Sequence, residues 1–128
     1  MRDPAYVMDR TLVEAIEDPE ASILLSSARR PGNYVVMSGG DPVLLVEENG
    51  ARLRATTNLG LRRRVPAALK AFRDRRMAAA GMSGRVVVRE WNGKPVLESD
   101  GRKLLTAAGF REDFPGMTYD AVAARAVR

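Results

Sequence analysis

The residue types best suited to chemistry in this chain are cations, and they are concentrated in one short stretch. Between positions 62 and 76 the sequence carries seven basic side chains and one acid, Asp74. Most of the seven are arginines, whose planar guanidinium group donates hydrogen bonds in pairs and therefore suits phosphate oxygens. The pattern predicts contact with the phosphates of a nucleic acid, single-stranded DNA or RNA, through Arg62, Arg63, Arg64, Lys70, Arg73, Arg75 and Arg76.

Two other interpretations of the basic stretch remain open. A cationic helix could dock on an acidic partner protein or on an acidic neighbouring domain, because opposite charges also guide protein association. It could also be an ordinary solvated helix face. Nucleic-acid contact ranks first among the three interpretations, docking second and solvation third.

Arg89 and Trp91 form a second candidate feature. Trp91 is the only tryptophan, and an unpaired base could stack on its ring beside the Arg89 cation. An isolated tryptophan on a strand is more often a residue of the core or its rim. We include both residues in the candidate nucleic-acid interface, and we favour a packing role for Trp91.

Enzymatic chemistry has little support in the residue types. Histidine and cysteine are absent, which removes the commonest general base, the commonest metal ligand and all thiolate chemistry. The glycines at Gly39-Gly40 and Gly93 lack the other residues of a P-loop, and no G-x-S-x-G elbow occurs. The acid pairs Glu47-Glu48 and Glu112-Asp113 would face opposite sides of a strand. We therefore predict no catalytic residue, no cofactor and no metal in this chain alone, and a small enzyme is the weakest hypothesis.

Length and charge place the whole chain, residues 1–128, in a single domain with a basic middle. Residues 1–50 carry 4 basic and 9 acidic side chains (net −5), residues 51–90 carry 11 and 2 (net +9), and residues 91–128 carry 6 and 5 (net +1). A polyanion would bind the middle segment. No apolar run reaches the ~20 residues that span a bilayer, and the chain does not open like a signal peptide. A cytoplasmic location without membrane contact is expected.

The basic stretch is expected on a helix that follows a three-stranded meander. Val65, Leu69, Phe72 and Met77 approximate one apolar face of a helix beginning near Pro66. Turn residues separate three β-type runs before it, which we expect as strands over Asn33–Ser38, Val43–Glu47 and Arg52–Thr57. The middle run, 43–46, is apolar on both faces, so the sheet should be covered on both sides or curled into a partial barrel.

The stretch Arg85–Arg111 has the pattern of a compact folding unit. We expect a strand through Trp91, a hairpin turn at Asn92-Gly93, a short returning strand at 95–97, and a helix capped by Ser99 and ended by Gly109. A last strand is expected at 117–119, a short helix at 9–16, and a helix-compatible tail at 120–128. The predicted fold class is α+β, a curled mostly antiparallel sheet of about five or six strands, or a partial β-barrel, with flanking helices.

The same folding unit resembles a known family. The strand, the segment NGKPVLES, the helix end AAGF and the following Pro115-Gly116-Met117 are similar to the C-terminal, DEAD/H-associated region of large helicase-related (Lhr) proteins. With Asp18-Pro19 and the hairpin from Arg29 to Leu53, the resemblance covers residues 18–119. It implies an accessory module of an ATP-dependent helicase, without motor motifs of its own, whose partners are nucleic acid and motor domains in the same or another chain. No catalytic residue carries over from the family.

Overall fold

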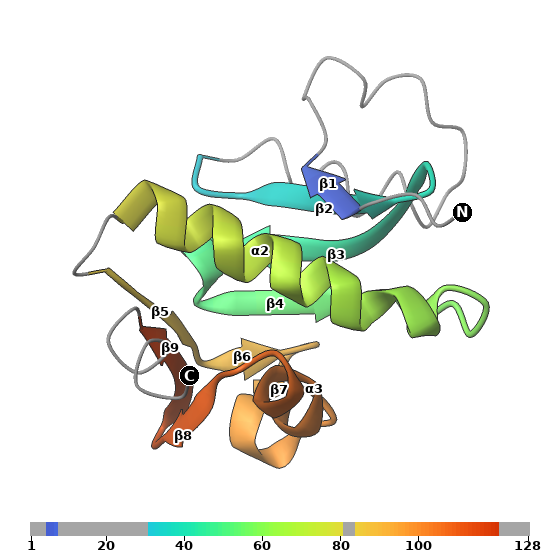
Figure 1. Ribbon diagram of the computed structural model, residues 1–128. Coiled ribbons are helices and arrows are strands. Elements are labelled where there is room, and N and C mark those ends of the chain that lie inside the picture. The colour runs from blue at the N-terminus through green and yellow to red at the C-terminus, as the bar shows by residue number, and fades with distance from the viewer. Residues whose placement is uncertain (1–4, 8–30, 81–83, 121–128) are drawn as a thin grey trace.

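The computed structural model describes residues 5–7, 31–80 and 84–120 of the 128-residue chain. These residues form two sheets and two α-helices, and the α+β class predicted from the sequence is confirmed (Figure 1). The helix expected at 9–16 lies outside the described residues, as does the tail expected at 120–128 except for Asp120, which ends a strand.

The larger sheet contains the predicted meander. Its six strands run in the order β1-β2-β3-β4-β6-β7. Every neighbouring pair is antiparallel except β4 and β6, which are parallel. The strands are β1 (Ala5–Val7), β2 (Tyr34–Ser38), β3 (Asp41–Glu47), β4 (Arg52–Ala55), β6 (Glu90–Trp91) and β7 (Lys94–Pro95). The 3₁₀ helix η2 (Glu48–Gly50) joins β3 to β4, where turn residues separate the second and third predicted strands.

The smaller sheet is antiparallel and has the order β5-β9-β8. Its strands are β5 (Arg85–Val88), β8 (Arg111–Asp113) and β9 (Gly116–Asp120). Strand β9 confirms the predicted last strand, whereas β8 was not expected. The predominantly antiparallel arrangement is as predicted, and neither sheet closes into a barrel. The chain leaves one sheet for the other at Arg89 instead of closing a single one.

Two α-helices cover these sheets. Helix α2 (Val65–Ala80) follows the 3₁₀ helix η3 (Arg62–Arg64) and lies across the larger sheet in Figure 1. Its predicted apolar face is confirmed, because Val65, Leu69 and Phe72 are buried and Met77 packs against the core. Helix α3 (Gly101–Ala107) follows the 3₁₀ helix η4 (Val96–Glu98). Neither α2 nor α3 is long and apolar enough to cross a membrane.

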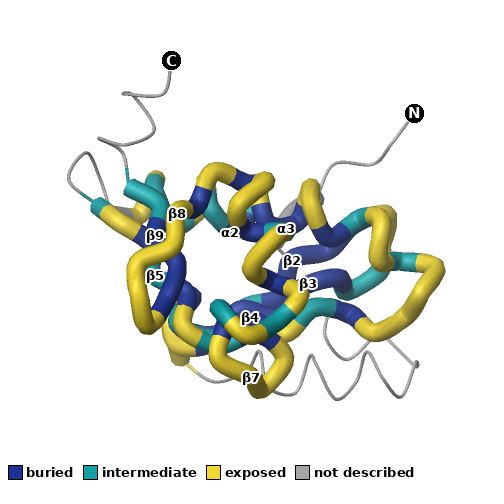
Figure 2. The backbone as a smooth tube through the Cα atoms, turned by 90° about the horizontal axis from the view of Figure 1, so that it is seen from below, coloured by how far each residue is buried: buried dark blue, intermediate teal, exposed yellow. Residues whose placement is uncertain are grey.

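The core lies between α2 and the two sheets. Leu44 and Val46 of β3 belong to the same apolar cluster as Leu69 and Phe72 of α2. The whole run 43–46 is at most 1% exposed, so both faces of β3 are covered, as its sequence predicts. Figure 2 shows these buried strands inside a rim of exposed turns.

The predicted strand from Val86 to Trp91 is not continuous. The backbone amides of Arg89 and Glu90 both donate to the carbonyl oxygen of Ala51, at 2.8 and 3.1 Å. This double contact interrupts the strand alternation, and the chain passes from the smaller to the larger sheet. Trp91 consequently joins Val86 in one core cluster instead of facing the opposite way.

The rest of the folding unit follows the sequence closely. Asn92 (φ 50°) and Gly93 (φ 81°) have the positive φ angles that the tight hairpin turn requires. The hydroxyl oxygen of Ser99 accepts a hydrogen bond from the amide of Gly101 (3.1 Å) at the start of α3, and Gly109 (φ 98°) follows its end. The returning strand is shorter than expected, because Val96 already begins η4.

Candidate nucleic-acid interface

The seven cations at positions 62–76 lie on several sides of the α2 segment. Because residues of an α-helix turn by about 100° each, Arg73 and Arg75 lie roughly 200° apart around the axis. Arg73 faces β9 and the end of α3, whereas Arg75 faces β2. The structure therefore does not gather the seven cations on one phosphate-binding face.

Arg64 anchors the start of α2 to the β2–β3 hairpin. Its Nη1 donates to the carbonyl oxygen of Ser38 (2.8 Å) and lies 3.1 Å from Oδ2 of Asp41. Both partners flank the turn between β2 and β3. Both contacts come from Nη1 and hold the guanidinium against this hairpin, so Arg64 has a structural role in the fold.

Arg73 joins α2 to the C-terminal end of α3. Its Nη1 donates to the carbonyl oxygen of Ala108 (2.6 Å), its Nε pairs with Asp74 (3.0 Å), and its guanidinium lies 5.0 Å from the centre of the Tyr119 ring. The side chain is 20% exposed. A cation near the end of a helix also interacts favourably with the helix dipole. Arg73 is therefore a structural residue in this fold.

Substitution of Arg73 by methionine tests whether this side chain stabilises the fold or binds nucleic acid. Methionine keeps an apolar stem but removes the charged donor, so we expect the free energy of unfolding to fall by about 1.5–2 kcal/mol. Urea unfolding followed by Trp91 fluorescence measures this decrease. We expect the affinity of the variant for a single-stranded oligonucleotide to stay within a factor of about two. A variant with unchanged stability and much weaker binding would instead assign Arg73 to the nucleic-acid interface.

Arg75 and Arg76 lie near Tyr34 of β2. The Arg75 guanidinium is 5.0 Å from the centre of the Tyr34 ring. Burial raises the pKa of Tyr34 to about 12, although the positive charges of Arg76 and Arg75 lower it. The phenol is thus neutral at physiological pH, and its buried hydroxyl has no hydrogen-bond partner in the described part of the chain. These two arginines lie roughly 20 Å along the helix from Arg62.

Arg62, Arg63 and Lys70 remain as the exposed cations at the N-terminal end of the α2 segment. We call these three residues the N-terminal basic group. None of them has an ion pair with any carboxylate in residues 31–80 and 84–120. Arg62 and Arg63 are neighbours in η3, and Lys70 follows about two helical turns later. Within those ranges, no carboxylate competes with a ligand for their hydrogen-bond donors.

Arg89 and Trp91 do not extend this group. Trp91 is 3% exposed and belongs to the core, so the packing role favoured from the sequence is confirmed and its ring offers no face to a base. Arg89 is exposed, but its backbone amide donates a hydrogen bond to the carbonyl oxygen of Ala51, at the start of β4. Ala51 precedes the N-terminal end of β4, whereas the N-terminal basic group comes after its C-terminal end. The structure therefore separates both residues from the group.

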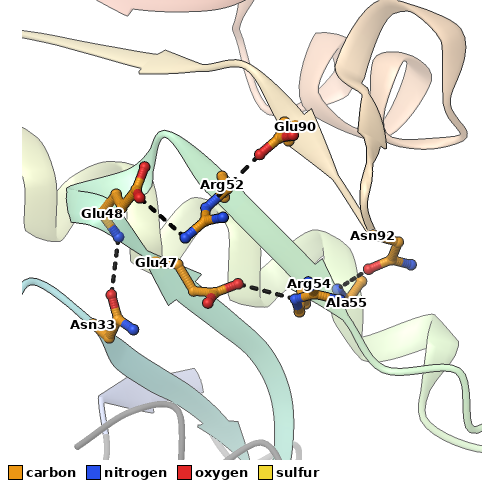
Figure 3. Close-up of polar contacts among 8 residues, drawn as sticks. All are labelled: Asn33, Glu47, Glu48, Arg52, Arg54, Ala55, Glu90 and Asn92. Atoms are coloured by element: carbon orange, nitrogen blue, oxygen red, sulfur yellow. Dashed lines mark hydrogen bonds and ion pairs between the residues drawn. The ribbon is translucent and has the colours of Figure 1, made fainter. Parts of the chain in front are cut away.

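Other cations of the basic middle segment are neutralised near the β3–β4 hairpin (Figure 3). Arg54 Nε donates to Oε1 of Glu47 (3.0 Å), whose side chain is 10% exposed. Arg52 pairs with Glu48 at 3.0 Å and lies 3.7 Å from Glu90 of β6. The adjacent acids are thus bound to arginines, which favours a structural role for them.

The order of charges in the sequence contains a signal for this cluster, although none of the predictions above includes it. Two acids precede the Asn49-Gly50 turn and two arginines follow it, so a hairpin must bring them together. Two amide side chains complete the cluster in Figure 3: Asn33 Oδ1 accepts the Glu48 amide at 2.9 Å, and Asn92 Oδ1 accepts the Ala55 amide at 2.7 Å. The first hydrogen bond lies within the meander, and the second joins the meander to the C-terminal folding unit.

The candidate site therefore consists of exposed cations. No group of three carboxylate, histidine or cysteine side chains that could hold a metal occurs in the described ranges. Comparisons of the chain with models of protein families, with curated proteins and with solved structures found no match in any of the three. The similarity to the Lhr C-terminal region stays a prediction that rests on the short motifs alone.

Proposed function

We propose that this chain is an accessory nucleic-acid-binding module that contacts the phosphates of single-stranded DNA or RNA and has no ATPase of its own. The observation that carries this proposal is the N-terminal basic group, Arg62, Arg63 and Lys70. Its members are exposed and have no carboxylate partner among the described residues. Exposed cations of this kind donate hydrogen bonds to phosphate oxygens, and these contacts do not depend on base sequence.

The Lhr resemblance extends this proposal. In this proposal the module acts beside the motor domains of an ATP-dependent helicase, in the same or another chain, and contacts the nucleic acid along which the motor moves. A cytoplasmic location belongs to the same proposal. The alternative, docking of the basic group on an acidic partner protein, uses the same side chains and is distinguished by experiment.

The test is a titration of a fluorescent single-stranded oligonucleotide at several salt concentrations. The double variant Arg62→Glu/Arg63→Glu is compared with Lys94→Glu/Lys103→Glu, a control with the same change of charge on exposed lysines of β7 and α3. We expect the first variant to bind roughly 10-fold or more weakly at low salt. In a plot of log affinity against log salt concentration, its slope should become less steep by roughly 0.7 for each phosphate that it no longer neutralises. The control should bind almost as well as the unaltered chain.

Equal weakening in both variants would mean that only net charge matters, and the N-terminal basic group would have no special role. An unaltered chain that does not bind at low salt would contradict autonomous nucleic-acid binding. In that case the docking alternative takes its place.

A further inference from the structure

Two large apolar side chains are exposed in the described part of the chain, and their surroundings differ in charge. Leu59, in the loop between β4 and η3, is 78% exposed, and Phe114, in the turn between β8 and β9, is 87% exposed. Leu59 precedes the exposed cations Arg62 and Arg63. Phe114 directly follows the acids Glu112-Asp113, which pair with Arg102 (2.7 Å) and Arg111 (3.8 Å), so the arginines near it are already engaged by carboxylates. Of the two, Leu59 therefore combines an apolar tip with charges that complement a nucleic acid.

The loop that carries Leu59 is held by hydrogen bonds within itself. The hydroxyl oxygen of Thr56 accepts the amide of Asn58 (3.1 Å), and the side-chain oxygen of Asn58 accepts the amide of Gly60 (2.9 Å). The carbonyl oxygen of Asn58 also accepts the amide of Leu61 (3.0 Å). The exposed leucine is thus preorganised, and binding through it requires little further ordering of the loop.

Both ends of the loop are attached to the core of the fold. Thr56 is 7% exposed, and its amide donates to the carbonyl oxygen of Val43 (2.9 Å). Arg64 is bound to the β2–β3 hairpin at the other end. Figure 1 shows the loop projecting beyond the end of the larger sheet, and Figure 2 shows most of it exposed. The result is a fixed projection with an apolar tip and an arginine pair at its base.

We infer that Leu59 is a wedge that inserts beside the last base pair of a duplex, at a junction with single-stranded nucleic acid, while Arg62 and Arg63 hold the flanking phosphates. Apolar side chains such as leucine insert between base steps and unstack them in proteins that deform duplexes. A base pair next to a single-stranded end costs less to unstack than one inside a duplex. This inference rests on the proposed function, and it assigns to the interface a preference for junctions.

A membrane surface is the other ligand with an apolar interior and anionic groups. Stable anchoring to a bilayer needs a large apolar face or more than one lipid signal. One leucine with two neighbouring arginines supplies neither. The observations therefore favour nucleic acid, and vesicle binding becomes an outcome of the test.

The experiment uses a forked DNA with 2-aminopurine at the base pair next to the fork, and a blunt hairpin of the same length as reference. Four proteins are compared: the unaltered chain, Leu59→Ser, Phe114→Ser as the matched exposed apolar control, and Arg62→Glu/Arg63→Glu. We expect the unaltered chain to prefer the fork and to raise the 2-aminopurine fluorescence. Leu59→Ser should bind the fork roughly 5-fold more weakly without this rise, and Phe114→Ser should behave as the unaltered chain.

The outcomes separate the inference from the proposed function. If Leu59→Ser keeps both the fork preference and the fluorescence rise, the wedge is wrong while phosphate binding stands. If the unaltered chain binds the fork and the hairpin equally well, the wedge is also wrong. If it binds no nucleic acid at low salt, the proposed function fails and the wedge fails with it. Leu59-dependent binding to phosphatidylserine vesicles, tighter than binding to the fork, would assign the projection to a membrane instead.

Discussion

Phe72→Ala is expected to destabilise the fold by about 3–5 kcal/mol, the usual cost of removing a fully buried aromatic ring. Phe72 is 0% exposed and stacks on Phe110, with ring centres 6.4 Å apart and planes at 7°. A Cβ atom on Gly50 would lie 2.8 Å from the Phe72 ring, so the ring also rests on the backbone of η2. Its removal leaves a cavity where α2, the β3–β4 turn and the end of α3 meet.

This cost is a large share of the total, because domains of this size are stable by about 5–15 kcal/mol. We expect the melting temperature to fall by roughly 10–20 °C, measured by circular dichroism. Phe114→Ala is the matched control, since it removes the same ring from a position that is 87% exposed. A control that is destabilised as much as Phe72→Ala, or a destabilisation by Phe72→Ala below about 1 kcal/mol, would contradict the central position of this ring.

The elements predicted correctly are those determined by neighbouring residues. The meander follows from two turn signals and short apolar runs, and the β3–β4 and β6–β7 turns show positive φ at Asn49 and Asn92. Strand β8 could not be predicted in this way, because Arg111–Asp113 is charged and exposed at every position. It forms because it pairs with β9. The break at Arg89 likewise depends on the carbonyl oxygen of Ala51, an atom that no local pattern points to.

The candidate site was likewise predictable only where neighbouring residues determine it. The concentration of cations could be predicted from the sequence, but the partners of individual cations could not. Arg64 and Arg73 donate to the carbonyl oxygens of Ser38 and Ala108, and backbone oxygens leave no signature in side-chain composition. Helical spacing alone indicates that the cations of α2 face different directions, but it does not show which of them remain free for a ligand.

Gly101→Ala is the second substitution with a large expected effect, and sequence and structure predict opposite signs for it. Gly101 begins α3, where alanine would favour the helix by up to about 1 kcal/mol. In the structure, a Cβ atom at Gly101 would lie 2.3, 2.5 and 2.6 Å from Cδ2, Cγ and Cε3 of Trp91. Overpacking of a core costs about 1–3 kcal/mol and occasionally more, so we expect a net destabilisation of about 3 kcal/mol.

A double-mutant cycle identifies the residue pair responsible. Circular dichroism is used to follow urea unfolding of Gly101→Ala, Trp91→Leu and the double variant, with Lys103→Ala as an exposed control on α3. Leucine is smaller than tryptophan and can shift away from the new methyl group, so the cost of Gly101→Ala should fall below about 1 kcal/mol in the Trp91→Leu background. An equal cost in both backgrounds would place the strain elsewhere in α3. A gain in stability from Gly101→Ala alone would contradict this prediction. It would mean that the backbone of α3 moves enough to admit the methyl group, so that helix propensity outweighs the packing of Trp91 on this helix.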